Sequence, residues 1–331
     1  MAVARRRPSS IYLADVEERE ISWACEGYFP RGVISSLYAP RNTGKTNVVV
    51  RIAADLSRGQ FMGRPHPVRR AFINTMEDDV PSVLKPRFTA TDGDLSMIAA
   101  THSEWRLPRD LPRIETLIIT NRDRGEPFDI LVLDSIQTHI PVTNQAAASE
   151  ALLGLVRLAR EFRLAVLLIG HLNKSKTGTA AQAMQGLGVF QAESKGLYVL
   201  GLDPDDPDNL VLTCERLGIA APPPNLMFRL KSHGKSAALE YVGTDTVLTS
   251  DDVYRASIAP RLTGKAPTRV QTCSWFIRAE LAQAGGAIDE DDLLSAAIDA
   301  GAYSRDPTYQ KALKLAGAVC ENGIVTIGSA E

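Results

Sequence analysis

The chain has 331 residues, of which 44% are hydrophobic and 23% are charged, and its formal net charge is −2. These values are typical of a globular protein with one sizeable α/β domain and a smaller companion. A net charge so close to zero argues against a protein that coats nucleic acid by bulk electrostatics, but it leaves room for a local basic channel.

The ends of the chain and its cysteines indicate a protein of the reducing cytoplasm. Residues 1–10 are basic but no apolar segment follows them, so we expect a basic tail, with DNA contact as an alternative, and no secretory signal. The four cysteines are far apart and show no metal-ligand spacing. The longest apolar runs, such as Leu164 to Gly170, are too short to cross a bilayer. We therefore expect a cytoplasmic location and no membrane partner.

Residues 11–242 alternate β-rich runs with helical patterns, which predicts an α/β domain with a mostly parallel, twisted β-sheet flanked by helices. The strands are expected at residues 33–38, 71–75, 128–134, 164–170, 196–202, 210–214, 226–230 and 238–242. The helices are expected at residues 47–58, 114–122 and 149–162.

The chain changes character after residue 242. Residues 243–270 are polar and rich in turn formers, and we expect a linker with room for a short helix. Residues 271–331 show three helical patterns and a β-like tail, which is the outline of a small winged-helix-like domain. Acidic residues outnumber basic ones there, so partner docking or subunit packing is as good an interpretation as DNA binding.

A turn between the first strand and the first helix has the pattern of a phosphate-binding loop. Its candidate ATP ligands are Ala39, Pro40, Arg41, Asn42, Thr43, Gly44, Lys45 and Thr46. In such a loop backbone N–H groups and a helix N-terminus face the phosphates. Lys45 would reach the β and γ phosphates, and the Thr46 hydroxyl would hold Mg²⁺. Ala39 stands where this pattern normally has a glycine, and alanine restricts the backbone there.

Two carboxylates and a histidine follow later strands. Asp134 ends the most apolar strand, where a charge is costly unless it faces a site, so we expect a magnesium ligand, with a helix cap as the alternative. Glu77 follows the second strand, from where a carboxylate can reach the γ phosphate, and either Asp78 or Asp79 is expected to cap the next helix. His171 ends another apolar strand and is a candidate γ-phosphate sensor, with a structural role as the alternative.

Together these motifs resemble the RecA-like superfamily of P-loop ATPases, and within it the RepA-type hexameric helicases of plasmids and phages. The resemblance covers most of the chain and rests on Trp23, Pro30-Arg31-Gly32 and residues 39–46, 76–78, 129–135, 170–175 and 185–190. It implies a RecA-like core that hydrolyses ATP, with Glu77 as the general base.

The resemblance also implies a ring of six identical subunits, a hexamer, with ATP between neighbouring subunits. Arg216 aligns with the arginine that this family donates across the interface, although Cys214 stands where relatives often have a basic residue. The alternative is an ordinary surface arginine. The family's DNA loops correspond to residues 138–149 and 174–185. The second carries our candidate DNA-binding residues, which are Lys174, Lys176, Thr177, Gln182 and Gln185.

We therefore expect a DNA-dependent ATPase that translocates on or unwinds DNA in phage- or plasmid-type replication. Its expected partners are single-stranded DNA, further copies of the chain in a homo-oligomeric ring, and other replication or recombination proteins. The alternatives are a recombination ATPase that forms filaments or anneals strands, a helicase loader, and a KaiC-like signalling ATPase. The single phosphate loop argues against the last, because that clock protein has a duplicated core.

Overall fold

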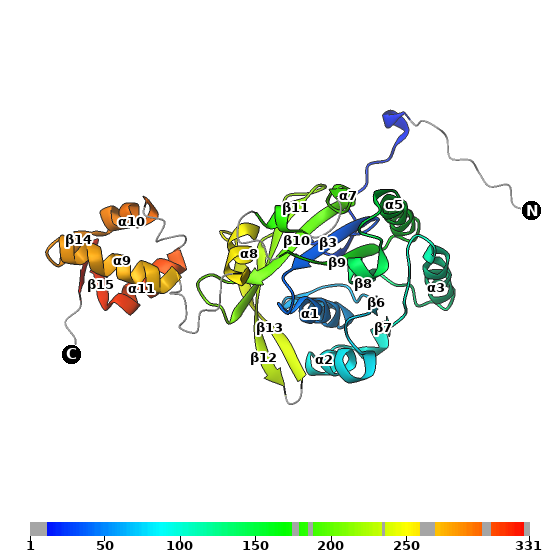
Figure 1. Ribbon diagram of the computed structural model, residues 1–331, viewed down its shortest axis with the longest axis horizontal. Helices are drawn as coiled ribbons and strands as arrows, with labels where there is room; N and C mark the ends of the chain where they lie inside the picture. The colour runs from blue at the N-terminus through cyan, green and yellow to red at the C-terminus, as the bar shows by residue number, and fades with distance from the viewer. Residues whose placement is uncertain are drawn as a thin grey trace, which may run out of the picture.

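The computed structural model describes residues 12–173, 179–184, 188–233, 236–258, 269–299 and 306–327. Its main unit is built on one large sheet (Figure 1). The strands of this sheet are β3 (Val33–Ala39), β6 (Ala71–Thr75), β7 (Ile98–Thr101), β8 (Ile130–Asp134), β9 (Ala165–His171), β10 (Ser194–Leu202), β11 (Asn209–Leu217), β12 (Asn225–His233) and β13 (Ser236–Asp245).

The sheet has nine strands in the order β13-β12-β11-β10-β3-β9-β8-β6-β7. The strands β10, β3, β9, β8, β6 and β7 run parallel to one another, whereas β11, β12 and β13 extend the sheet beyond β10 in antiparallel fashion. This arrangement confirms the expected α/β fold with a mostly parallel sheet. The strand β7 was not predicted, because its four residues carry no run of large apolar side chains.

Helices cover both faces of the sheet. They are α1 (Lys45–Ser57), α2 (Lys85–Ala90), α3 (Leu111–Asp123), α4 (Ile136–His139), α5 (Gln145–Phe162), α6 (Ala180–Ala183), α7 (Gly188–Glu193) and α8 (Ser250–Ile258). No described helix combines the length and the hydropathy that crossing a membrane requires. Short pairs of strands, β1 (Trp23–Cys25) with β2 (Phe29–Pro30) and β4 (Gln60–Phe61) with β5 (Arg64–Pro65), lie outside the large sheet.

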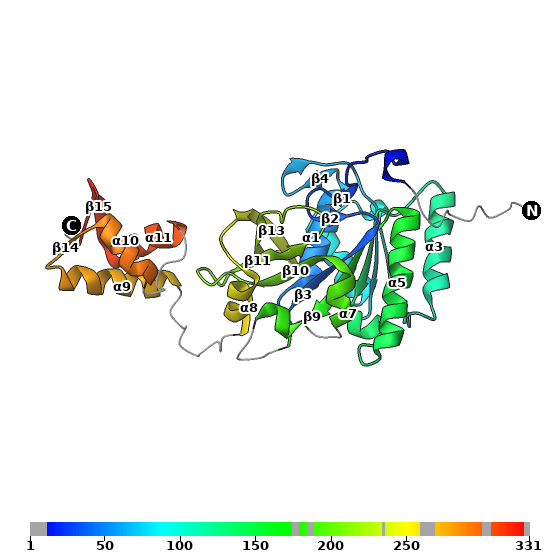
Figure 2. The same ribbon diagram turned by 90° about the horizontal axis from the view of Figure 1, so that it is seen from above.

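Alternation along the strands divides the core into two layers. In β8, Leu131 and Leu133 pack with α3 and α5, whereas Ile130 and Val132 pack with α1 and α2 on the opposite face. Figure 2 shows α3 and α5 side by side on their face of the sheet. Because β8 is buried on both faces, its sequence is a continuous apolar run, as is typical of a central parallel strand.

Helix α8 lies within residues 243–270, where a linker was expected, and it packs on β10. A Cβ atom on Gly201 would lie 2.3 Å from the Val253 carbonyl oxygen, so glycine permits this close contact. The Ser257 hydroxyl also accepts a hydrogen bond of 2.8 Å from the Leu202 backbone N–H. The main unit therefore extends at least to Ile258 rather than ending at residue 242.

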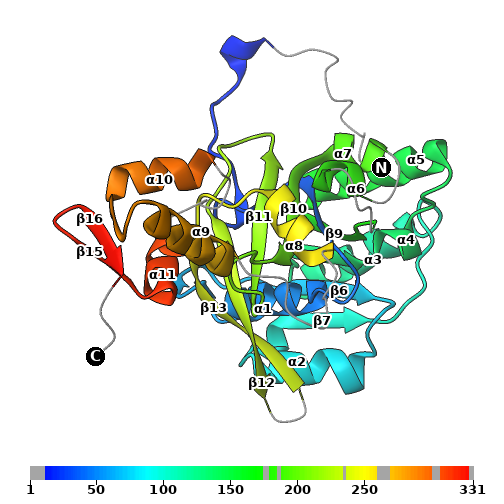
Figure 3. The ribbon, with the colours of Figure 1, turned by 60° about the vertical axis from the view of Figure 1, so that its left-hand side comes forward.

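A smaller unit follows at the C-terminus, and we call residues 269–327 the C-terminal unit. Its elements are α9 (Arg269–Gln283), β14 (Ala287–Asp289), α10 (Glu290–Asp299), α11 (Asp306–Ala316), β15 (Ala318–Glu321) and β16 (Ile324–Ile327). The strands form an antiparallel sheet in the order β14-β16-β15, and Figure 3 shows β15 and β16 as a hairpin next to α11. The unit has its own apolar core, which includes Ile277, Leu293 and Val325. Three helices and one strand were expected, and the structure adds β14 and β15.

Candidate nucleotide site

The parallel strands bring the predicted site residues to one edge of the sheet. Thr75 pairs with Asp134, and Asp134 pairs with Ile169 on β9. Ala39 pairs with His171. The phosphate loop and the residues that follow β6, β8 and β9 therefore leave the sheet at its carboxyl edge, where ligands bind in open α/β sheets.

The phosphate loop turns sharply before α1. Gly44, which precedes the first residue of α1, has a φ of 93°, a left-handed conformation that glycine adopts without strain. Asn42 is also left-handed, with a φ of 62°, which asparagine tolerates better than most residues. Ala39 is the last residue of β3 and is not among the residues with positive φ, so its backbone does not require the glycine of the usual pattern.

Lys45 and Thr46 open helix α1 and face the carboxylate of Asp134. The Lys45 side chain is buried, and its Nζ donates to the Pro40 carbonyl oxygen at 3.3 Å. Burial lowers the pKa of Lys45, and the charges of Glu77 and Asp134 oppose this effect. The Thr46 hydroxyl donates to Asp134 Oδ2 at 3.1 Å.

Asp134 is 1% exposed, and no residue in the described part of the chain donates a hydrogen bond to its Oδ1 atom. Burial, and secondarily the charge of Glu77, raise its pKa to about 7. An orphaned buried carboxylate oxygen beside the Thr46 hydroxyl fits an oxygen-coordinated magnesium ion. The described residues hold no cluster of three His, Cys, Asp or Glu side chains suited to a metal, so phosphate and water oxygens would have to complete this site.

Glu77 and His171 meet at the same edge. The Nε2 atom of His171 lies 2.9 Å from Oε1 of Glu77, and the hydrogen bond from His171 lowers the pKa of Glu77. The Glu77 side chain is 40% exposed, whereas that of His171 is 7% exposed. A carboxylate that is ionised and reachable from solvent is suited to accept a proton from water.

Sequence patterns did not identify Arg87, which also reaches the site. It lies on α2, and its Nη1 atom is 2.5 Å from Asp78 Oδ2. Both side chains line a cavity of about 140 Å³ together with Lys45, Thr46 and Glu77. The neighbouring Asp79 caps the turn before α2, because its carboxylate accepts the Ser82 backbone N–H at 2.9 Å. The cap is thus Asp79 and not Asp78, and no motif would have revealed Arg87.

A larger cavity of about 940 Å³ adjoins the phosphate loop. Its volume is within the range of small-molecule sites. Beyond the loop it is lined by residues from the β10–β11 loop, β11, β12 and α8, including Pro207, Asp208, Leu210, Arg229 and Ser257. These residues were also missed, since they come from four segments that only the fold brings together. If the phosphates of a nucleotide bind the loop, the nucleoside part would lie in this cavity.

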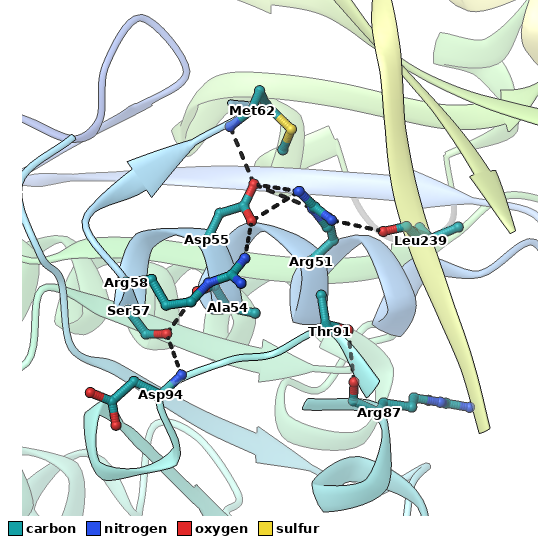
Figure 4. Close-up of polar contacts among 10 residues, drawn as sticks. All are labelled: Arg51, Ala54, Asp55, Ser57, Arg58, Met62, Arg87, Thr91, Asp94 and Leu239. Carbon is teal, nitrogen blue, oxygen red and sulfur yellow. Dashed lines mark hydrogen bonds and ion pairs between the residues drawn. The ribbon is translucent and has the colours of Figure 1, made fainter. Parts of the chain in front are cut away.

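A buried carboxylate fixes the helix that carries Lys45 and Thr46 (Figure 4). Asp55 is 1% exposed, and it accepts hydrogen bonds from Arg51, Arg58 and the Met62 backbone N–H. Arg51 also donates to the Leu239 carbonyl oxygen at 3.2 Å, which ties α1 to β13. This network fixes the position of α1 and therefore the direction in which the phosphate loop points.

The predicted DNA loop is described only in part. Lys174, Lys176, Thr177 and Gln185 lie outside the described residues. Gln182 lies on α6, where its side-chain oxygen accepts the Thr179 backbone N–H at 3.0 Å. It therefore caps a helix in this structure.

Helix α8 anchors the segment that flanks this loop. The Tyr254 hydroxyl donates to the Asn173 carbonyl oxygen at 2.7 Å, and Asp251 accepts the Ala180 backbone N–H at 2.7 Å. Asn173, which is two residues from His171, and Ala180 are therefore bound to the same helix on either side of positions 174–178.

Arg216 does not reach this chain's own site. It lies on β11 and pairs with Leu197 of β10, which in turn pairs with Ser36 of β3. Ser36 is three residues before the end of β3, so Arg216 lies away from the carboxyl edge of the sheet. Its guanidinium group donates to the carbonyl oxygens of Gln191 and Ser194, at 3.0 Å for Ser194. The side chain is exposed, so a role in nucleotide chemistry would require a second subunit.

Of the comparisons with known proteins, one covers the candidate site. A family model described as an AAA domain matches residues 3–177, which is more than half of the chain and includes the phosphate loop, Glu77, Asp134 and His171. No curated protein matches the sequence significantly. Among solved structures, the crystal structure of the RadB recombinase matches with a TM-score of 0.45 and 21% identity, over 61% of this chain and 89% of that one. A match this weak has no bearing on function.

Proposed function

Because the chain belongs to the AAA domain family, we propose that it is a magnesium-dependent ATPase whose nucleotide state is coupled to DNA binding. The observation that carries the proposal is the convergence of Lys45, Thr46, Asp134, Glu77 and His171 at one edge of the sheet. These side chains come from four different elements, and the group supplies a cation, a candidate metal ligand pair and a base.

Each residue has a role in hydrolysis. The backbone of the phosphate loop and Lys45 bind the β and γ phosphates. Thr46 and Asp134 would hold Mg²⁺, which neutralises charge on the phosphates. Glu77 takes a proton from the attacking water, whose oxygen bonds to the γ phosphorus while the bond to the bridging oxygen breaks. His171 orients the Glu77 carboxylate through its hydrogen bond.

The connection from His171 to α8 supports coupling to DNA. His171 contacts Glu77, and the segment two residues later is anchored to α8 on both sides of positions 174–178. A change at the γ phosphate that moves Glu77 would reach this segment through His171. We propose that the segment contacts single-stranded DNA phosphates through Lys174, Lys176 and Thr177, without sequence preference.

The test is ATP hydrolysis with and without single-stranded DNA, for the wild type, Lys45→Ala and the control Lys85→Ala, an exposed lysine on α2. Hydrolysis that DNA stimulates, and that only Lys45→Ala abolishes, supports the proposal. Hydrolysis that ignores DNA overturns the coupling and indicates a loader or signalling ATPase. No hydrolysis overturns the ATPase assignment. A strand-displacement assay beside an annealing assay then separates a helicase from a recombination ATPase.

We further propose that the active enzyme is a ring in which Arg216 acts on the neighbouring subunit's nucleotide. Arg216→Ala leaves each subunit's own site intact, whereas Lys45→Ala leaves the arginine intact. Mixing these two inactive variants should therefore restore part of the hydrolysis, because some interfaces combine a working site with a working arginine. If no mixture regains activity, the shared interface is wrong.

A further inference from the structure

One short loop contacts both the nucleotide cavity and the C-terminal unit. It joins β10 to β11 at residues 203–208, with the sequence Asp-Pro-Asp-Asp-Pro-Asp, and it projects toward the C-terminal unit in Figures 1 and 2. Its ends are bound together, since the Asp203 N–H donates to the Asn209 carbonyl at 3.0 Å and the Asn209 N–H donates to the Asp206 carbonyl at 2.8 Å. These bonds and two prolines make the loop stiff.

One side of the loop forms part of the cavity wall. Pro207 and Asp208 line the cavity of about 940 Å³ beside the phosphate loop. Asp206 pairs with Arg229 at 2.6 Å, and Arg229 lines the same cavity. Anything that fills this cavity therefore meets the loop directly, through Asp208, and indirectly, through the Arg229 ion pair.

The other side of the loop contacts the C-terminal unit. The Thr308 hydroxyl, in the first turn of α11, donates to the carboxylate of Asp205. Thr308 is 1% exposed and Asp205 is 7% exposed, so this charge-assisted hydrogen bond is shielded from water. The charge of Asp205 also acts on Cys273 of helix α9, whose thiol pKa is raised to about 11, mainly by burial and further by this charge.

We propose that the loop at residues 203–208 is the docking surface of the C-terminal unit, and that docking there strengthens nucleotide binding in the adjoining cavity. Only two residues, Asp206 and Pro207, lie between Asp205 and Asp208, so a stiff loop held at one side is preorganised at the other. By linkage, a nucleotide that binds the cavity stabilises the docked C-terminal unit by the same factor. The inference rests on the proposed nucleotide binding and assigns its regulation to the C-terminal unit.

The experiment measures the affinity of the full chain for a fluorescent, non-hydrolysable ATP analogue with Mg²⁺. Thr308→Val removes the hydroxyl and keeps the side-chain shape, and Asp205→Ala removes the partner from the main unit. The matched control is Thr326→Val, an exposed threonine on β16. We expect Thr308→Val and Asp205→Ala each to raise the dissociation constant by about threefold or more, and the double variant to add little to either. Thr326→Val should have no effect.

Hydrogen exchange with and without the analogue provides the reciprocal readout. In the wild type, the analogue should slow exchange in α11 as well as in the phosphate loop, and Thr308→Val should remove only the effect on α11. If the analogue protects the phosphate loop but leaves α11 unchanged, and Thr308→Val binds like the wild type, the coupling is overturned while nucleotide binding stands. If the analogue protects neither segment, nucleotide binding itself is wrong and the regulation falls with it.

Discussion

The imidazole of His171 and the carboxylate of Glu77 lie 2.9 Å apart, Nε2 to Oε1, although 94 residues separate them in the sequence. His171 is the last residue of β9, and Glu77 lies in the turn after β6. Strand β8 lies between these two strands in the sheet. The pair connects Glu77, the proposed base, to the segment that α8 anchors beyond His171. Replacing Glu77 and replacing His171 should therefore have different effects on hydrolysis.

Replacing Glu77 by Gln should slow turnover by about 10²- to 10⁴-fold, because the amide cannot accept the proton of the attacking water. The affinity for ATP should change little, since Lys45 and the loop backbone bind the phosphates. Single-turnover hydrolysis and equilibrium binding separate the two effects. Asp79→Asn is the control, because it makes the same chemical change two residues away, at a carboxylate that caps the turn before α2 instead of facing the site. Turnover of Glu77→Gln close to that of the wild type would rule out the base.

Replacing His171 by Ala should remove most of the stimulation by DNA, since the hydrogen bond that links the site to the anchored segment is lost. The measured quantity is the ratio of hydrolysis rates with and without single-stranded DNA. His171→Gln retains a side-chain N–H donor and should recover part of the ratio. A wild-type ratio in His171→Ala would show that coupling takes another path.

Asp134 makes stability depend on pH. Its folded pKa of about 7 lies above its ordinary value of 3.8, so the folded state binds the extra proton and the free energy of unfolding falls as pH rises through 7. Without Mg²⁺, the wild type should lose about 2 kcal/mol between pH 5.5 and pH 8, by integration of the pKa shift. Asp134→Asn should not show this loss. Urea unfolding at the two pH values measures it, and parallel curves for the two proteins would contradict the assignment.

Replacing Arg87 by Ala should weaken nucleotide binding by about tenfold, the loss of one charge-assisted contact. Arg87 lines both cavities, and its guanidinium group is paired with Asp78. It therefore lies where it could contact the phosphates or the ribose of a bound nucleotide. Equilibrium binding of the ATP analogue measures the effect, with Lys85→Ala on the same helix as the control. Equal affinities for the two variants would place Arg87 outside the nucleotide site.

Replacing Asp55 by Asn should lower the free energy of unfolding by about 3 kcal/mol, since Arg51 and Arg58 lose a buried anionic partner. The control is Asp123→Asn, whose exposed pair with Arg122 should contribute less than about 1 kcal/mol. Urea unfolding compares the two. A loss of stability no greater than that of the control would show that Asp55 does not hold α1 in place.

Local sequence determined the parts of this protein that depend on neighbours along the chain. Residues 33–58 predicted a strand, a phosphate loop and a helix, and Asp134 and His171 were placed at strand ends, because strand, turn and helix signals lie within a few residues of each other. The alternation of strands and helices was enough to predict a mostly parallel sheet.

Tertiary structure alone decided which distant side chains meet. The order of the strands placed His171 beside Glu77, and packing on Gly201 drew α8 into the main unit from a segment with the composition of a linker. Arg87 and the acidic loop at residues 203–208 belong to no sequence motif. They were recognised only because the fold places them in the walls of the cavities beside the phosphate loop. Such contacts depend on the path of the whole chain, and no local pattern records it.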